Sequence, residues 1–283
     1  MKTDNTFNSN KATKLVNIKN GTASVTVTAD KNMQNIQNFT ATYNGNSKYY
    51  ENISAIVKAQ IKSRKAKVVV TTTPTTQDQR KAITFKVKIT DITKTKATIP
   101  KNNNNSYVYF KINGNTLQDS SSKTVKVKVV NGTATYKYTI PPATAGLTSS
   151  KKTKNYVLTA IYCNPNYSTA KNTTTYHVKR STTRFNITKT TYAKKTGTLT
   201  ITGKLKDYKN CNVLGTTYVN LKINGQVFKI NNKIAEYKVQ NGTVNIKIKV
   251  PTSIKTIQNV TLTSKDRLAY IYTTATTKKI TRV

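Results

Sequence analysis

The ionisable side chains of this sequence are too sparse to build an active site. The chain has one histidine, His177, which lies in the strand-like segment Thr-Tyr-His-Val-Lys. Acid–base catalysis needs groups that converge on one substrate, yet the carboxylates lie at least 13 residues apart in the chain. They are Asp4, Asp30, Glu51, Asp78, Asp91, Asp119, Asp207, Glu236 and Asp266. The sequence therefore predicts that the protein is not an enzyme, and it assigns no catalytic or binding residue.

Metal and cofactor sites are not expected either. The two cysteines, Cys163 and Cys211, show no Cys-x-x-Cys or Cys/His spacing. The chain also has no acidic calcium loop, no glycine-rich phosphate loop and no Gly-x-Ser-x-Gly turn. The cysteines fall in different predicted domains, so we expect two incidental thiols and no intradomain disulfide. Asp91 and Asp207 each end a predicted strand, where an aspartate side chain commonly forms a turn.

The charge of the chain leaves two interpretations open. Lys and Arg number 48 against 9 acidic residues, which gives a formal net charge of +39. Lysines can simply occupy the solvated faces of strands and prevent strand edges from pairing. Alternatively, such a charge attracts polyanions, and Tyr107, Tyr109 and Tyr218, predicted on outer faces, are candidate contact residues. Because arginine, the usual reader of bases, is scarce, we expect no specific nucleic acid as a partner.

The segment that would position any such surface is Lys123–Pro141. Apolar residues alternate with polar ones on both sides of Asn131-Gly132. A period of two buries one side of a strand and exposes the other, and Asn-Gly accepts the positive φ angles of a tight turn. The segment therefore predicts a β-hairpin.

The same turn recurs along the chain. Asn20-Gly21, Asn131-Gly132 and Asn241-Gly242 lie 111 and 110 residues apart, and each precedes an alternating strand. The segment Val108–Gly114 is repeated 111 residues later at Val219–Gly225. About seven short strands per repeat, with regular turns, are typical of a sandwich of two antiparallel sheets.

These repeats predict an all-β protein of tandem immunoglobulin-like β-sandwich domains. The predicted domains are 62–180 and 181–283, and 1–61 is predicted to hold only the back half of a repeat. Half a sandwich exposes an apolar face, so we expect the chain to be a fragment of a longer array. No segment approaches the ~18 apolar residues of a membrane span, and the N-terminus lacks a signal-peptide core.

The repeat resembles a known family. The Lys-Ile-Asn-Gly turn at 111–114, the Asn-Gly-Thr-Ala turn at 131–134 and the Leu-Thr-Ala-x-Tyr strand at 158–162 resemble the Ig-like repeats of adhesin-like surface proteins of methanogenic archaea. Related repeats occur in bacterial Ig-like proteins. The resemblance covers nearly the whole chain, and it implies an extracellular array of stalk or adhesive modules.

The resulting hypothesis is a non-enzymatic, cell-surface adhesin-like or stalk protein. Its expected partners are glycans or proteins on a host or neighbouring cell, or an acidic cell-wall polymer. The alternative is a basic polyanion-binding protein, acting on nucleic acid or acidic polysaccharide, for which counterion release would make binding strongly dependent on salt.

Overall fold

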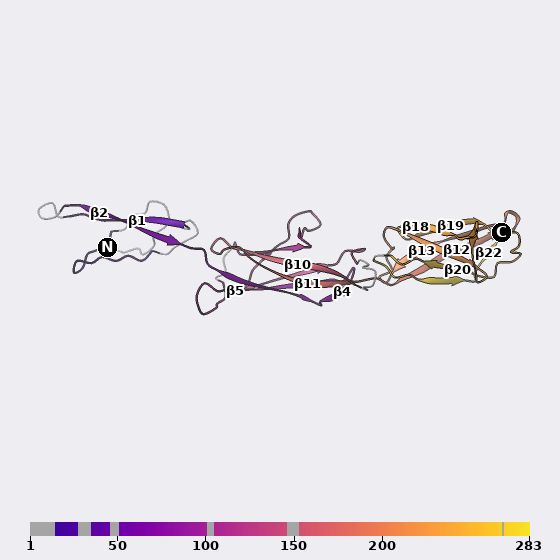
Figure 1. The fold of residues 1–283 in the computed structure, drawn as a ribbon, viewed down its shortest axis with the longest axis horizontal. Helices are drawn as coiled ribbons and strands as arrows, with labels where there is room; N and C mark the ends of the chain where they lie inside the picture. Colours follow the sequence, from indigo (N-terminus) through magenta and orange to yellow (C-terminus); the bar gives the residue numbers. More distant parts are fainter. Residues whose placement is uncertain (1–14, 28–34, 46–50, 101–104, 146–152, 268) are drawn as a thin grey trace.

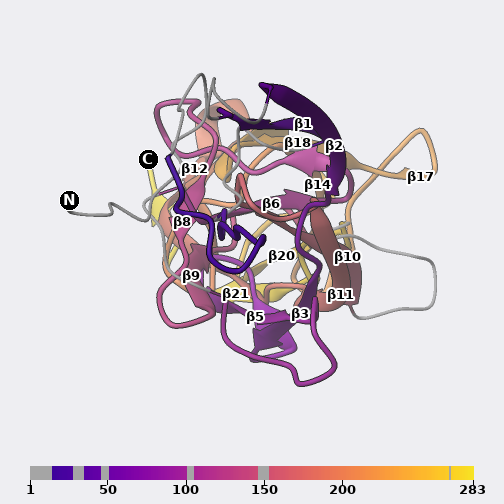
Figure 2. The same cartoon turned by 90° about the vertical axis from the view of Figure 1, so that its left-hand side faces the viewer.

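The computed structural model describes residues 15–27, 35–45, 51–100, 105–145, 153–267 and 269–283. Its regular structure is almost entirely β, with one short 3₁₀ turn at Lys194–Thr196. Figure 1 shows three units that follow one another along the longest axis of the molecule, and Figure 2 views them along that axis. Among the described residues, no helix has the length and apolar character needed to cross a membrane.

The middle unit is a sandwich of two sheets. One sheet has the order β3-β5-β9, and the other has the order β4-β11-β10-β6-β7, with β8 also paired to β6. The strands are β3 (Ala66–Thr73), β4 (Thr76–Asp78), β5 (Ala82–Asp91), β6 (Tyr107–Ile112), β7 (Asn115–Thr116), β8 (Lys126–Lys128), β9 (Thr133–Thr139), β10 (Thr153–Cys163) and β11 (Ala170–Lys179). Neighbouring strands are antiparallel, except that β4 pairs with β11 in parallel. This arrangement of strands is an immunoglobulin-like sandwich.

The C-terminal unit repeats the arrangement. Strands β12, β13 and β19 correspond to β3, β5 and β9, and β14, β18, β20 and β21 correspond to β6, β8, β10 and β11. Their bounds are β12 (Thr183–Ala193), β13 (Thr198–Asp207), β14 (Thr216–Ile223), β18 (Glu236–Gln240), β19 (Thr243–Lys249), β20 (Val260–Ser264), β21 (Thr274–Thr277) and β22 (Thr281–Arg282). Four short strands complete it: β15 (Gln226–Val227), β16 (Lys229–Ile230), β17 (Lys233–Ile234) and, parallel to β12, β22. The predicted all-β fold of tandem Ig-like sandwiches is confirmed.

Alternation along each strand builds the two cores. In β5, the side chains of Ile83, Phe85, Val87 and Ile89 are at most 2% exposed, while the lysines between them face solvent. Tyr136 and Tyr138, whose alternation with lysine and threonine predicts an inward position, pack on this core, and the ring of Tyr138 lies 5.3 Å from that of Phe85. Aromatic pairs at this separation add to the stabilisation from burial.

The predicted turn at Asn131-Gly132 forms, but the prediction that its two flanking strands pair with each other as a hairpin is wrong. Asn131 and Gly132 have φ angles of 47° and 68°, and Val130 and Thr133 exchange backbone hydrogen bonds. Beyond this turn the two strands separate, because β8 pairs with β6 in one sheet and β9 pairs with β5 in the other. The turn at Asn241-Gly242 behaves alike, since β18 and β19 pair only at Gln240 and Thr243. The Asn-Gly turn is therefore the corner at which the chain passes between sheets.

In the first unit, the structure describes this turn at Asn20-Gly21 and one pair of strands. β1 (Asn35–Tyr43) and β2 (Ile53–Ile61) are antiparallel throughout. Val25, whose alternation with polar residues after Asn20-Gly21 predicts burial, is 47% exposed, and Ile53 and Ile56 are 69% and 65% exposed. Within the described part of 1–61, no second sheet covers these side chains, which explains their exposure. We keep the limits 1–61, 62–180 and 181–283 as proposed domain boundaries.

Candidate functional site at the junction of the two sandwiches

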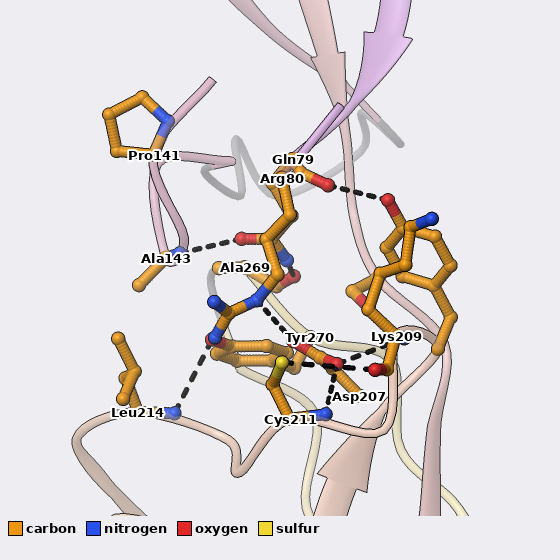
Figure 3. A network of polar contacts seen from close by, with 12 residues as sticks. Gln79, Arg80, Pro141, Ala143, Asp207, Lys209, Cys211, Leu214, Ala269 and Tyr270 are labelled. Atoms are coloured by element: carbon orange, nitrogen blue, oxygen red, sulfur yellow. Dashed lines mark hydrogen bonds and ion pairs between the residues drawn. The ribbon is translucent and has the colours of Figure 1, made fainter. Parts of the chain in front are cut away.

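The best-defined polar cluster of the molecule joins the two sandwiches. The turn between β4 and β5 carries Gln79 and Arg80, and it contacts the end of β13 and residue Ala269 (Figure 3). We call this cluster, Gln79, Arg80, Asp207, Tyr208 and Ala269, the junction. Arg80 adopts a φ of 65°, and its backbone amide donates to the carbonyl of Ile140, which fixes the turn to the end of β9.

Gln79 is fully buried at the junction and uses both ends of its amide. Nε2 donates to the carbonyl of Ala269, in the C-terminal sandwich, at 2.9 Å. Oε1 accepts from the backbone amide of Ala143 at 2.6 Å. The hydroxyl of Tyr208 donates to the Gln79 carbonyl at 2.7 Å. A buried amide is costly unless its polar atoms are paired, so Gln79 requires the C-terminal sandwich in this position.

Arg80 and Asp207 form an ion pair between the sandwiches. Arg80 Nε lies 2.6 Å from Asp207 Oδ2, and the side chains are 21% and 0% exposed, respectively. Asp207 Oδ1 accepts from the amides of Lys209 and Cys211, each at 3.0 Å. Burial acts to lower the pKa of Arg80, but the hydrogen bond and the charge of Asp207 outweigh it, and the pKa is raised. The guanidinium therefore remains charged beside a carboxylate that is removed from water.

The middle sandwich has the corresponding carboxylate at Asp91, paired differently. Asp91 Oδ1 accepts from the amide of Thr93 at 2.9 Å, and Oδ2 accepts from Arg64 Nε at 2.8 Å and from the Tyr167 hydroxyl at 2.7 Å. Burial acts to raise the pKa of Asp91, but the hydrogen bonds from Thr93, Tyr167 and Arg64 together lower it well below its usual range. The turn role predicted for both aspartates agrees with their Oδ1 contacts.

Comparing the two ends explains why Asp207 uses an arginine from another sandwich. The backbone of Arg64 forms a parallel β-bridge with Tyr167. At the corresponding place in the C-terminal sandwich, Ser181 forms a parallel β-bridge with Tyr270. Serine cannot reach and neutralise the carboxylate as arginine does. Arg80 of the preceding sandwich therefore supplies the positive charge that Arg64 supplies to Asp91.

The segment between the sandwiches is also fastened by an arginine. Arg180 lies 3.1 Å from Asp266 and donates to the carbonyls of Arg267 and Tyr270 at 2.9 and 2.6 Å. Burial acts to raise the pKa of Asp266, but its hydrogen bonds from the Tyr272 amide and from Arg180 lower it overall. The linker is thereby held against the C-terminal sandwich.

Arginine was the signal that the sequence analysis missed. Six of the 48 basic residues are arginines. Five of them donate hydrogen bonds to residues at the N-terminal-facing end of the middle or the C-terminal sandwich. They are Arg64, Arg80, Arg180, Arg184 and Arg267. The planar guanidinium fits carboxylates and carbonyls with several directed donors, which lysine cannot do. In a chain that otherwise uses lysine, these positions mark the ends and the junction.

The structure brings no catalytic cluster together within the described residues. His177 Nδ1 lies 2.7 Å from Asn155 Oδ1 on a strand pair, and no group of three or more metal-binding side chains occurs in the part of the chain searched. Cys163 and Cys211 are both free. Tyr107 and Tyr109 are half-buried on the outward side of β6, and Tyr218 is 44% exposed. The candidate contact residues are thus accessible, and the junction has the geometry of a structural connection.

Comparisons with known proteins find similar solved structures but no match in sequence. No family model and no curated protein matches the chain. Similar solved structures include the tandem Ig repeats of Dlar (10% identity, 78% of this chain and 97% of that chain, TM-score 0.27) and a titin structure (8%, 77% and 98%, TM-score 0.40). The adhesin InvE of Yersinia pseudotuberculosis is another (10%, 74% and 57%, TM-score 0.38). The assignment of the fold rests on the strand order and register of this chain.

Proposed function

We propose that the protein is a non-enzymatic, extracellular surface protein whose tandem Ig-like sandwiches act as a stalk or adhesive spacer. One observation carries the proposal: the two sandwiches are joined end to end through the ion pair of Arg80 with the buried Asp207 and through the buried Gln79 amide. A flexible linker would need no such contacts, whereas a spacer that holds a binding surface away from a cell benefits from a stiff joint. The archaeal adhesin-like family remains part of this proposal.

Surface exposure on intact cells tests the proposal. Cells that express the native gene are treated with an external protease, and the C-terminal sandwich is followed with an antibody. We expect the signal to be lost while a cytoplasmic marker enzyme stays intact. A signal that persists until the cells are lysed would place the protein inside and contradict the proposal.

The alternative function, polyanion binding, is favoured by the chemistry of one sheet face. On β6, β8, β10 and β11 the outward side chains include five lysines and no carboxylate. The lysines are Lys111, Lys126, Lys128, Lys171 and Lys179. A face of this kind attracts anions whatever the cellular location.

A further inference from the structure

The outward face of the middle sandwich contains a hollow lined by aromatic and polar side chains. The hollow measures about 320 Å³, and its lining includes Tyr107, Tyr109, Lys126, Cys163 and Thr169. These residues come from β6, β8, β10 and the turn before β11. The ammonium of Lys126 lies over the ring of Tyr107, 4.0 Å from its centroid. A cation is thus held at the wall of an open, partly aromatic depression.

Strand register extends this hollow into a row across the sheet. Tyr109 is opposite Lys126 on one side and Ile161 on the other, and Ile161 is opposite Lys171. Three interstrand steps of about 4.8 Å place the backbones of Lys126 and Lys171 roughly 14 Å apart. A chain molecule lying across the strands would therefore meet a cation, an aromatic ring and a second cation in succession.

The C-terminal sandwich has an ion pair at the position that corresponds to the hollow. By register, Tyr218 corresponds to Tyr107, Lys265 to Cys163 and Glu236 to Lys126. Lys265 and Glu236 form an ion pair there, so the ammonium of Lys265 is already neutralised by a carboxylate. The two sandwiches share a scaffold, but within the described part of the middle sandwich no carboxylate forms an ion pair with Lys126.

We propose that the hollow at Tyr107, Tyr109 and Lys126 binds an acidic sugar residue of an anionic polysaccharide. Lys126 donates to the carboxylate or sulfate of the sugar, and the ring of Tyr109 packs against its apolar C–H face. Thr169 supplies a hydroxyl at the rim, and Lys171 pairs with the next acidic group along the polymer. The inference rests on the proposed surface function, because that location brings the face into contact with acidic polysaccharide.

The face fits a sugar better than a nucleic acid. Binding of single strands uses successive aromatic rings on which bases stack, but the ring of Tyr107 is covered by Lys126. The row also contains no arginine, which is the side chain best suited to contact base edges. A hydroxylated, acidic polymer needs one ring, a cation and hydrogen-bonding groups, all of which are present.

Charge-matched variants test the site against the general charge of the chain. Binding of fluorescent tetragalacturonate to the purified full chain is measured at two salt concentrations for Lys126→Gln and Tyr109→Ala. The matched controls, Lys238→Gln and Tyr272→Ala, are exposed positions of the C-terminal sandwich. We expect the first pair to weaken binding about fivefold, as for the loss of one cation or one aromatic contact, and the controls to change it less than about twofold.

Three results would overturn the inference. They are equal losses for all four variants, which would indicate diffuse attraction; no detectable binding of the acidic oligosaccharide; and tighter binding of a single-stranded DNA oligonucleotide that is lost on the same substitutions. Circular dichroism of each variant checks that folding is intact. Surface exposure on cells is measured independently, so absent binding by a surface-exposed protein refutes this site alone.

Discussion

Arg80 and Asp207 lie in different sandwiches, so a mutation of Arg80 in the middle sandwich should lower the stability of the C-terminal sandwich. Replacing Arg80 with alanine leaves Asp207, fully buried, without its counter-charge. An unpaired buried charge is strongly destabilising, and we expect a loss of about 2–3 kcal/mol in the free energy of unfolding of the C-terminal sandwich. Hydrogen exchange resolved by peptide should show this loss in β13 and β19, although the mutated residue belongs to the middle sandwich.

Arg184→Ala is the matched control for Arg80→Ala. Arg184 lies at the same end of the C-terminal sandwich, and within the described part of the chain its one hydrogen bond goes to the exposed amide oxygen of Asn210, at 3.0 Å. Its removal leaves no buried charge, and exposed contacts of this kind contribute little. Equal losses of protection in the two variants would show that the junction pair contributes nothing beyond an ordinary surface contact.

Asp91 makes the stability of the middle sandwich depend on pH. Its pKa in the folded protein lies well below the value of about 3.9 in an unfolded chain. The unfolded state therefore binds a proton first as the pH falls, so stability is fully present above about pH 5 and decreases below about pH 4. Urea unfolding from pH 6 to pH 3 should show this decrease, and Asp91→Asn should flatten it. A profile identical in the two proteins would remove Asp91 as its source.

Residue roles were only partly predictable from the sequence. The turn role of Asp91 and Asp207 follows from their place after an alternating strand. Their partners do not, because Arg64 lies 27 residues from Asp91 and Arg80 lies 127 residues from Asp207. Such pairings depend on how sheets and domains assemble, which local alternation does not encode.

At the scale of elements, the Asn-Gly corners depend on their glycines. Gly242 has a φ of 70°, and a Cβ atom there would lie 2.5 Å from the carbonyl oxygen of Leu205. Gly242→Ala should therefore cost more than about 2 kcal/mol, since backbone strain and a steric clash add together. The measurement is the midpoint of thermal unfolding.

Gly225→Ala separates these two causes. Gly225 has a φ of 82°, but a Cβ atom there would meet nothing within 4 Å. Only the cost of the positive φ angle remains, about 1 kcal/mol. If both variants lose the same stability, then the close approach of Gly242 to β13 is not what requires glycine.

Alternation predicted the strands well but could not predict their partners. The residues around Asn131-Gly132 alternate in the same way whether the two strands pair with each other or enter different sheets. Because both sheets face the same core, the inward set is identical in the two cases. Val25 shows a second limit of alternation. Its pattern predicts burial, but burial also requires a second sheet to cover the side chain, and Val25 is exposed.

At the scale of the molecule, the junction should restrict the angle between the sandwiches. The double variant Gln79→Ala/Arg80→Ala removes the hydrogen bond to Ala269 and the ion pair to Asp207. Small-angle X-ray scattering should then show a broader distribution of interatomic distances than for the original protein. Lys86→Ala, on an exposed position of β5, is the control. An unchanged distribution in the double variant would mean that the linker alone sets the geometry.

The junction also gives the sandwiches a fixed order. The carbonyl of Lys81 accepts from Ile140, and at the corresponding place the carbonyl of Gly197 accepts from Val250, so Lys195 and Thr196 stand where Gln79 and Arg80 stand in the middle sandwich. A second copy of the C-terminal sandwich placed after the first would meet lysine and threonine, and its Asp207 would lack an arginine. The two Ig-like sandwiches are thus not interchangeable, although they share one fold. The middle sandwich carries at its far end the side chains that complete its successor, so this pair has a direction, and exchanging the two units would break the junction.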